Sequence, residues 1–253
     1  MRRRGLVLAL LLAALPTVSP HAQRGRGGGG GGQAASPQQA APVDLTGYWV
    51  SVVSEDWRYR MLTPPKGDVA GVPLNAEGRK VADAWDPAKD TVAGEACRAY
   101  GAAGVMRIPG RVHIAWQDER TLKVETDAGT QTRLFRFGGG AAAGSAERTW
   151  QGNSTAVWDA VQGGNGAPRW GSLRVVTTQL RPGYLRKNGV PYSENTVLTE
   201  YLDLQSGPKG STWVTITTIV NDPKYLTQEF LTSTDFRKEP DGAKFKPTPC
   251  AAD

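Results

Sequence analysis

The clearest pattern in the chain is an alternation of apolar and polar positions with a period of two between residues 172 and 220. Three runs carry it, at residues 172–180, 195–204 and 212–220, and valine, isoleucine and threonine are frequent in them. β-Branched residues at this period favour half-buried strands over helices. We therefore expect three successive strands of one antiparallel sheet here.

The rest of the pattern predicts more strands and one convincing helix, near residues 76–85. Asn75 is a suitable N-cap for this helix, and Leu74, Val81 and Trp85 recur at helical spacing. A second short helix or turn is expected within residues 91–100. Further strands are expected at residues 44–53, 104–109, 112–116, 121–126, 130–137, 150–158 and 226–236.

Short links between these runs favour antiparallel neighbours. The predicted fold class is all-β, an antiparallel meander that closes into a barrel, because closure removes exposed sheet edges. A sandwich of two sheets is the competing architecture.

The N-terminus has the three-part pattern of a secretory signal peptide. Three arginines precede an apolar run at residues 5–15, and a segment with two prolines follows and ends at Ala22. A membrane anchor is the alternative, but about eleven apolar residues are too few to span the hydrocarbon core. We expect a signal peptide at residues 1–22, a tether rich in glycine, alanine, glutamine and proline at residues 23–42, and one barrel domain at residues 43–253. The protein is expected to be periplasmic or secreted.

Charge changes this picture little. The formal net charge is +6, but five arginines precede the first acidic residue, Asp44, so the remainder carries about +1. We therefore expect no nucleic-acid partner and no charge-driven contact with an anionic membrane. The short apolar run leads us to expect no membrane span. The arginine and glycine tract at residues 24–32 leaves contact with RNA as a weaker alternative.

Cys97 and Cys250 are the two cysteines of the chain. In an oxidising compartment we expect them to form a disulfide that ties the C-terminal tail to a segment far upstream. The alternative is two separate buried thiols.

Candidate catalytic chemistry is sparse. Beyond the signal peptide His113 is the single histidine, and no phosphate-binding glycine motif opens a helix, so we predict no metal site and no cofactor. A pair of carboxylates could still hydrolyse glycosides. Glu200 is the acid to test first, because it shares a strand face with Leu198 and Leu202. If that face points inward, Glu200 needs a partner.

Arg133 and Arg174, each in the middle of a predicted strand, are the candidate partners of Glu200. The alternative is that Glu200 faces water. A second candidate region is the aromatic and basic cluster at residues 57–60, where Trp57 and Tyr59 could stack on a ligand beside arginines; an ordinary half-buried strand is the competing interpretation. The candidate ligand-binding residues are Trp57, Tyr59, Arg133, Arg174, Glu200 and Tyr201.

The chain resembles a group of uncharacterised exported bacterial proteins. The resemblance is carried, in order, by residues 73–79, 86–88, 126–133, 181–189 and 192–194. It covers most of residues 44–250 and implies no particular activity.

A wider resemblance is to lipocalins, through Gly47 and Trp49 in the motif that opens the first strand and through Thr126-Asp127, although Ala128 stands where the lipocalin turn motif has tyrosine. This resemblance implies a lipocalin-like barrel, and barrels of about this size can hold a small molecule. We therefore expect an exported module that binds a small, partly apolar ligand and is not an enzyme. A carboxylate-based hydrolase and a module that docks on an envelope protein partner are the alternatives; the oligomeric state and the ligand are not predicted.

Overall fold

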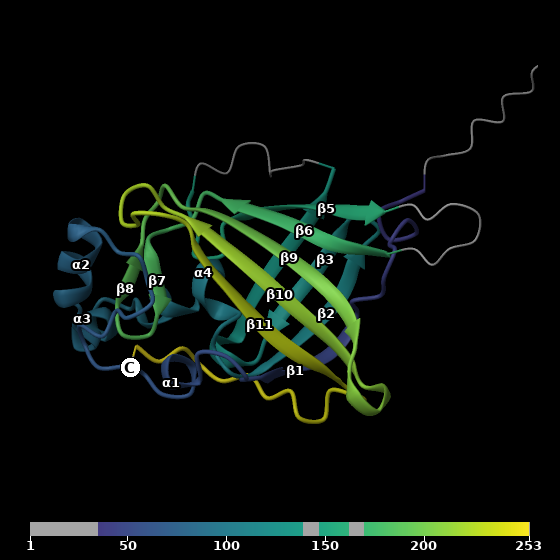
Figure 1. Ribbon diagram of the computed structural model, residues 1–253, viewed down its shortest axis with the longest axis horizontal. Helices are drawn as coiled ribbons and strands as arrows, with labels where there is room; N and C mark the ends of the chain where they lie inside the picture. The colour runs from purple at the N-terminus through teal and green to yellow at the C-terminus, as the bar shows by residue number, and fades with distance from the viewer. Residues whose placement is uncertain (1–34, 139–146, 162–169, 253) are drawn as a thin grey trace, which may run out of the picture. The chain divides into compact units, whose positions relative to one another are not determined.

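The computed structural model describes residues 35–138, 147–161 and 170–252. Within them, nine strands close into a barrel in the order β1-β11-β10-β9-β6-β5-β4-β3-β2, which confirms the predicted all-β barrel (Figure 1). The barrel strands are β1 (Gly47–Val52), β2 (Arg111–Asp118), β3 (Thr121–Thr126), β4 (Gln131–Phe137), β5 (Asn153–Val161), β6 (Trp170–Thr178), β9 (Val197–Ser206), β10 (Thr212–Asn221) and β11 (Phe230–Glu239).

The three runs of clearest alternation became neighbours in the barrel. β9 pairs with both β6 and β10, and all these pairs are antiparallel, as predicted. One pair differs from the predicted meander, because β4 and β5 run parallel over three residue pairs. A parallel pair requires a long crossover connection, whereas a short hairpin link would force antiparallel pairing.

The barrel interior is filled by one face of each strand. Alternate residues of β6, β9 and β10 point inward, and their apolar members form a core with Trp49 of β1 and Phe135 of β4. The indole Nε1 of Trp49 donates a hydrogen bond to the carbonyl of Leu45 at 3.0 Å, so this large buried side chain has no unsatisfied donor. The Trp49 that carries the lipocalin resemblance is therefore a core residue.

Short helices and a hairpin gather at one end of the barrel (Figure 1). They share a second hydrophobic cluster with the barrel strands, formed around Leu185, Tyr192, Leu198 and Val220. The elements of this end are α1 (Trp57–Arg60), α2 (Ala76–Asp83), α3 (Pro87–Val92), the 3-10 helix Ala96–Tyr100, α4 (Ala102–Val105), and the hairpin strands β7 (Gly183–Arg186) and β8 (Val190–Tyr192).

The predicted helix near residues 76–85 is α2. The side chain of Asn75 caps it by accepting a hydrogen bond from the Gly78 N–H at 2.9 Å, as predicted. Asn75 also donates through its side-chain nitrogen to the carbonyl of Lys224 at 2.8 Å. Leu226 also pairs with Leu74 in this segment, and β11 begins at Phe230 and not at residue 226 as predicted.

Two expected extended segments are not strands: residues 57–60 are helical, and residues 104–109 begin in α4 and continue as turns and bends. In α1 the guanidinium of Arg60 points inward and donates to the carbonyl of Arg107. Residues 102–105 form α4, where small side chains let the helix lie against β7; a Cβ on Gly104 would come within 2.7 Å of the carbonyl oxygen of Tyr184. A period of two over five or six residues could not distinguish these cases.

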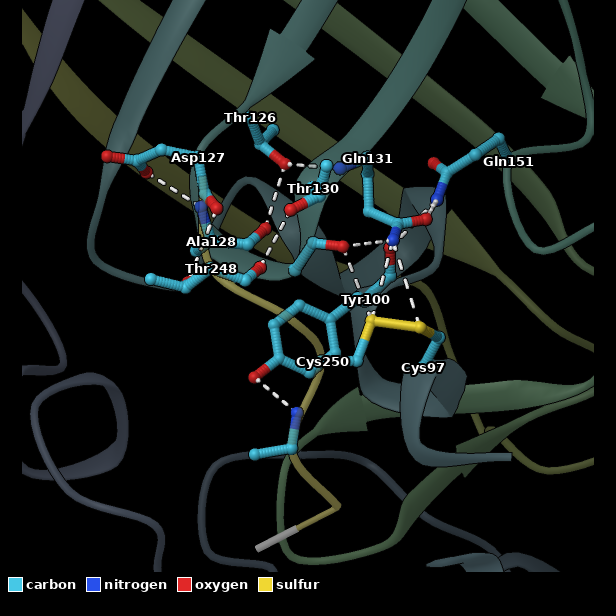
Figure 2. Close-up of a disulfide and its surroundings, with 12 residues drawn as sticks. Cys97, Tyr100, Thr126, Asp127, Ala128, Thr130, Gln131, Gln151, Thr248 and Cys250 are labelled. Atoms are coloured by element: carbon cyan, nitrogen blue, oxygen red, sulfur yellow. Dashed lines mark hydrogen bonds between the residues drawn. A yellow bond between two sulfur atoms is a disulfide. The ribbon is translucent and has the colours of Figure 1, made fainter. Parts of the chain in front are cut away.

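The C-terminal tail returns to this end of the barrel and is held there by the predicted disulfide between Cys97 and Cys250 (Figure 2). Hydrogen bonds continue the attachment: the Thr248 N–H donates to the carbonyl of Asp127 at 2.8 Å, and the Ala251 N–H donates to the Tyr100 hydroxyl at 3.3 Å. The tail therefore fastens the 3-10 helix to the turn between β3 and β4. Among the described residues, no helix has both the length and the apolar content needed to cross a membrane.

Candidate anion-binding site

The side chain of Glu200 points into the barrel and not toward water. Its side chain is 1 % exposed, and Arg133 holds both carboxylate oxygens, with Nη1 to Oε1 at 2.9 Å and Nη2 to Oε2 at 2.5 Å. Arg133 Nη2 also donates to Thr177 Oγ1 at 3.3 Å. Of the two arginines named from the sequence, Arg133 is therefore the partner.

This ion pair belongs to a polar layer across the barrel interior. On β9, Glu200 lies between Leu198 of one hydrophobic cluster and Leu202 of the other. The layer is completed by buried hydroxyl side chains, of Ser154, Thr177, Thr218, Thr232 and Thr234. Because both oxygens of Glu200 bind one guanidinium away from solvent, the carboxylate is poorly placed to act as a general acid or base.

The other predicted residues lie in two different places. Arg174 and Tyr201 face each other on the outside of the barrel, and Arg174 Nε contacts Asp159 at 3.0 Å. Trp57 is 65 % exposed on α1. Tyr59, also on α1, lines a cavity between α1, β7 and the chain that follows α4. The structure thus does not bring the six predicted residues into one site.

That cavity has a volume of about 270 Å³ and a cationic lining. Four basic side chains contribute to it: Arg60, Arg107, Arg186 and Lys187. None of the described residues that line it is acidic. The three arginines come from α1, from the segment after α4 and from β7, so the fold of this end of the molecule brings them together.

Arg60 and Arg107 tie α1 to the segment after α4. Arg60 Nε donates to the Arg107 carbonyl at 3.0 Å, and its Nη1 contacts Glu55 at 2.5 Å. Arg107 Nη2 contacts Asp56 at 2.6 Å, while its buried Nη1 has no hydrogen-bond partner in the described part of the chain. Each of these two guanidiniums therefore already holds one carboxylate from outside the cavity lining.

Arg186 differs from them because no carboxylate of the described residues lies within 4.0 Å of it. Its Nη1 donates to the carbonyl of Ala70 at 2.8 Å, and its buried Nε has no partner among the described residues. Its guanidinium carbon lies 4.2 Å from the centre of the Tyr59 ring. This contact stabilises the cation but does not neutralise it.

The arginines shift one another's proton affinity. Burial lowers the pKa of Arg186 and the charge of Arg107 lowers it further, while the charges of Asp56 and Asp68 oppose this shift. Burial also lowers the pKa of Arg60, where Glu55 opposes the shift and Arg107 adds to it. Burial and like charge both disfavour the cationic form, so an anion in the cavity would relieve a cost that the folded chain carries.

The sequence indicated only part of this site. Tyr59 and Arg60 lie in the aromatic and basic cluster that was noted, but Arg107 and Arg186 are distant along the chain and no pattern links them. The one usable signal in the sequence is the pair of basic residues at 186–187, directly before an Asn-Gly pair that is typical of a turn.

No protein-family model matches the chain, and no curated protein or solved structure is significantly similar to it. The described residues also contain no cluster of three or more histidine, cysteine, aspartate or glutamate side chains that could hold a metal ion. The geometry of the cationic cavity is therefore the basis for treating it as a candidate site.

Proposed function

We propose that this protein is a binding module for a small molecule that carries an anionic group, with the cavity at the helical end of the barrel as its site. The observation that supports this most directly is the convergence of three buried arginines on a cavity whose described lining has no acidic residue. Arginine clusters in partly buried clefts are suited to carboxylates and phosphates, because the planar guanidinium can offer two parallel N–H donors.

The contacts of the chain support an anion at this position. Glu55 and Asp56 already place carboxylate oxygens on Arg60 and Arg107, so the guanidiniums are oriented for oxygen acceptors. Neither of these carboxylates forms an ion pair with Arg186, which has no carboxylate within 4.0 Å among the described residues. A ligand anion at Arg186 would supply that contact.

We place the ligand at the helical end of the barrel and not in the barrel interior. The interior holds a hydrophobic core and the Arg133–Glu200 layer, both made by the protein itself. Export to a periplasmic or extracellular space remains part of the proposal; the disulfide is compatible with it, since such bonds persist in oxidising compartments. A lipocalin-like relationship is likewise proposed, supported by the closed barrel and by Trp49 in its core.

Arg186→Gln tests the proposal, with Arg174→Gln as the matched control because Arg174 carries the same charge on the outer wall. Inorganic phosphate is the probe, titrated into the full chain by isothermal calorimetry near pH 7. We expect saturable binding to the unmodified chain and to Arg174→Gln. In Arg186→Gln the affinity should fall by about 10- to 100-fold, since one charge-assisted contact contributes about 1.5–3 kcal/mol.

Circular dichroism of each variant establishes that the barrel is intact before binding is compared. Equal affinities of Arg186→Gln and Arg174→Gln would refute the site. Absence of any saturable phosphate binding to the unmodified chain would refute the proposed function.

A further inference from the structure

Apolar side chains make up the other half of the cationic cavity. Its wall includes Leu185 and Ile108, and its rim includes Met61 and Leu62, which directly follow α1. Met61 is 58 % exposed and Leu62 is 72 % exposed, although both are large and apolar. Charged and apolar groups thus line the same small cavity.

We infer that the ligand is an amphiphilic monoanion: a carboxylate joined to a short apolar chain, with the carboxylate at Arg186 and the chain against Leu185, Met61 and Leu62. This inference rests on the proposed function and specifies the class of ligand. The lining of the cavity supports an amphiphilic ligand, because a ligand with only a charged group would leave the apolar wall and rim without a partner.

The ion pairs of the three arginines leave a position for one ligand carboxylate. Arg60 and Arg107 each hold a carboxylate of the chain, whereas Arg186 has none within 4.0 Å among the described residues. A single ligand carboxylate therefore completes one carboxylate for each arginine. It also reaches the guanidinium whose pKa is lowered by burial and by Arg107.

The volume limits the size of the apolar part. A cavity of about 270 Å³ corresponds to about nine water molecules at liquid density. A ligand of about ten non-hydrogen atoms fills it, which is the size of an eight-carbon carboxylate. Longer chains would extend over Leu62 into solvent.

Three probes separate the two halves of the ligand: octanoate has both the charge and the chain, acetate has the charge alone, and 1-octanol has the chain alone. Calorimetric titration of the full chain should show octanoate binding at least about tenfold more tightly than either of the others. Two buried methylene groups account for about that factor over acetate, and one charge-assisted contact accounts for it over 1-octanol. Arg186→Gln should abolish this advantage over 1-octanol.

Leu62→Ser tests the apolar rim, and Val92→Ser is its control because Val92 is 90 % exposed on α3 and does not line the cavity. Leu62→Ser should weaken octanoate severalfold, by a larger factor than it changes phosphate affinity. Val92→Ser should change neither. Because both side chains are exposed, each variant is expected to fold.

The outcomes distinguish this inference from the proposed function. If phosphate binds through Arg186 but octanoate binds no more tightly than acetate, the amphiphilic ligand is wrong and the anion site stands. If 1-octanol binds as tightly as octanoate, the charge makes no contribution and the inference is wrong. If neither phosphate nor octanoate binds, both proposals are wrong.

Discussion

The pair of Arg133 and Glu200 places two opposite charges inside the barrel, where their side chains are 0 % and 1 % exposed. Removing both from water costs several kcal/mol per ion, and two short hydrogen bonds offset this cost only while both partners are present. Arg133 Nε remains without a partner in the described structure. The pair is therefore a point where a single substitution has a large effect.

Glu200→Gln should lower the free energy of unfolding by about 3–5 kcal/mol, because it leaves the Arg133 charge buried and uncompensated. Asp159→Asn is the control, since it removes the partner of Arg174 in an ion pair whose side chains are 37 % and 44 % exposed, and should cost less than about 1 kcal/mol. Denaturation in urea measures both. Similar losses in the two variants would show that the buried pair is not strongly coupled.

Exchange of both charged residues completes this test. In Arg133→Met with Glu200→Leu no charge is left unpaired, so the double variant should be more stable than Glu200→Gln.

The sequence predicted the face of β9 that carries Glu200 but not the direction in which that face points. The register of β9 with β6 decides which way this face points and which arginine pairs with Glu200. Glu200 lies opposite Val175, which faces the core, so Arg174 one residue earlier must face outward. Arg133 shares its inward face with Phe135 on β4. Choosing between the two arginines required this pairing, which no local pattern contains.

At the scale of elements, the hairpin of β7 and β8 carries the candidate site. β7 ends with Arg186, and the turn to β8 passes through Gly189, whose φ is +81°. A Cβ on Gly189 would lie 2.2 Å from Cγ of Trp85, just beyond the end of α2. The Asn188-Gly189 pair is typical of a turn, whereas no local pattern shows that this turn packs against the end of the helix.

Gly189→Ala should lower the free energy of unfolding by about 2–4 kcal/mol, from about 1 kcal/mol for the left-handed backbone and the rest for the contact with Trp85. Gly210→Ala separates the two contributions, because Gly210 has φ +72° with nothing within 4 Å of an added Cβ. That control should lose only about 1 kcal/mol. Thermal unfolding compares them.

Gly189→Ala should affect ligand binding as well as stability. A displaced turn would shift Arg186, so Gly189→Ala should also weaken phosphate binding, while Gly210→Ala should leave it unchanged. If Gly189→Ala is as stable as Gly210→Ala, the contact of the turn with α2 is not a rigid one.

At the scale of the folded domain, the sequence predicted the barrel well and its helical end poorly. Strand alternation over nine or ten residues was long enough to define β6, β9 and β10. α1 and α4 have four residues each, too few for a helical period to emerge. Arg60 lies on α1 and Arg107 follows α4. Because these helices are too short to be predicted from the sequence, the candidate site could not be predicted either.

The disulfide is the covalent link of this helical end to the tail. Cys97 and Cys250 are separated by 153 residues, and the loop between them includes β2 to β11. Because a cross-link over so long a loop removes much of the entropy of the unfolded chain, its loss should be costly. The pairing was predictable because the chain has two cysteines, whereas the position of the tail beside Tyr100 and Asp127 was not.

Cys97→Ser with Cys250→Ser should lower the free energy of unfolding by about 2–5 kcal/mol, and the melting temperature by about 4–20 °C for a domain of this size. The barrel pairs do not depend on the tail, so the circular dichroism of the strands should persist below the transition. A reductant should lower the melting temperature of the unmodified chain toward that of the double variant and leave the variant itself unchanged. If the double variant melts with the oxidised protein, the tail contributes through its hydrogen bonds to Asp127 and Tyr100, and the disulfide adds no stability.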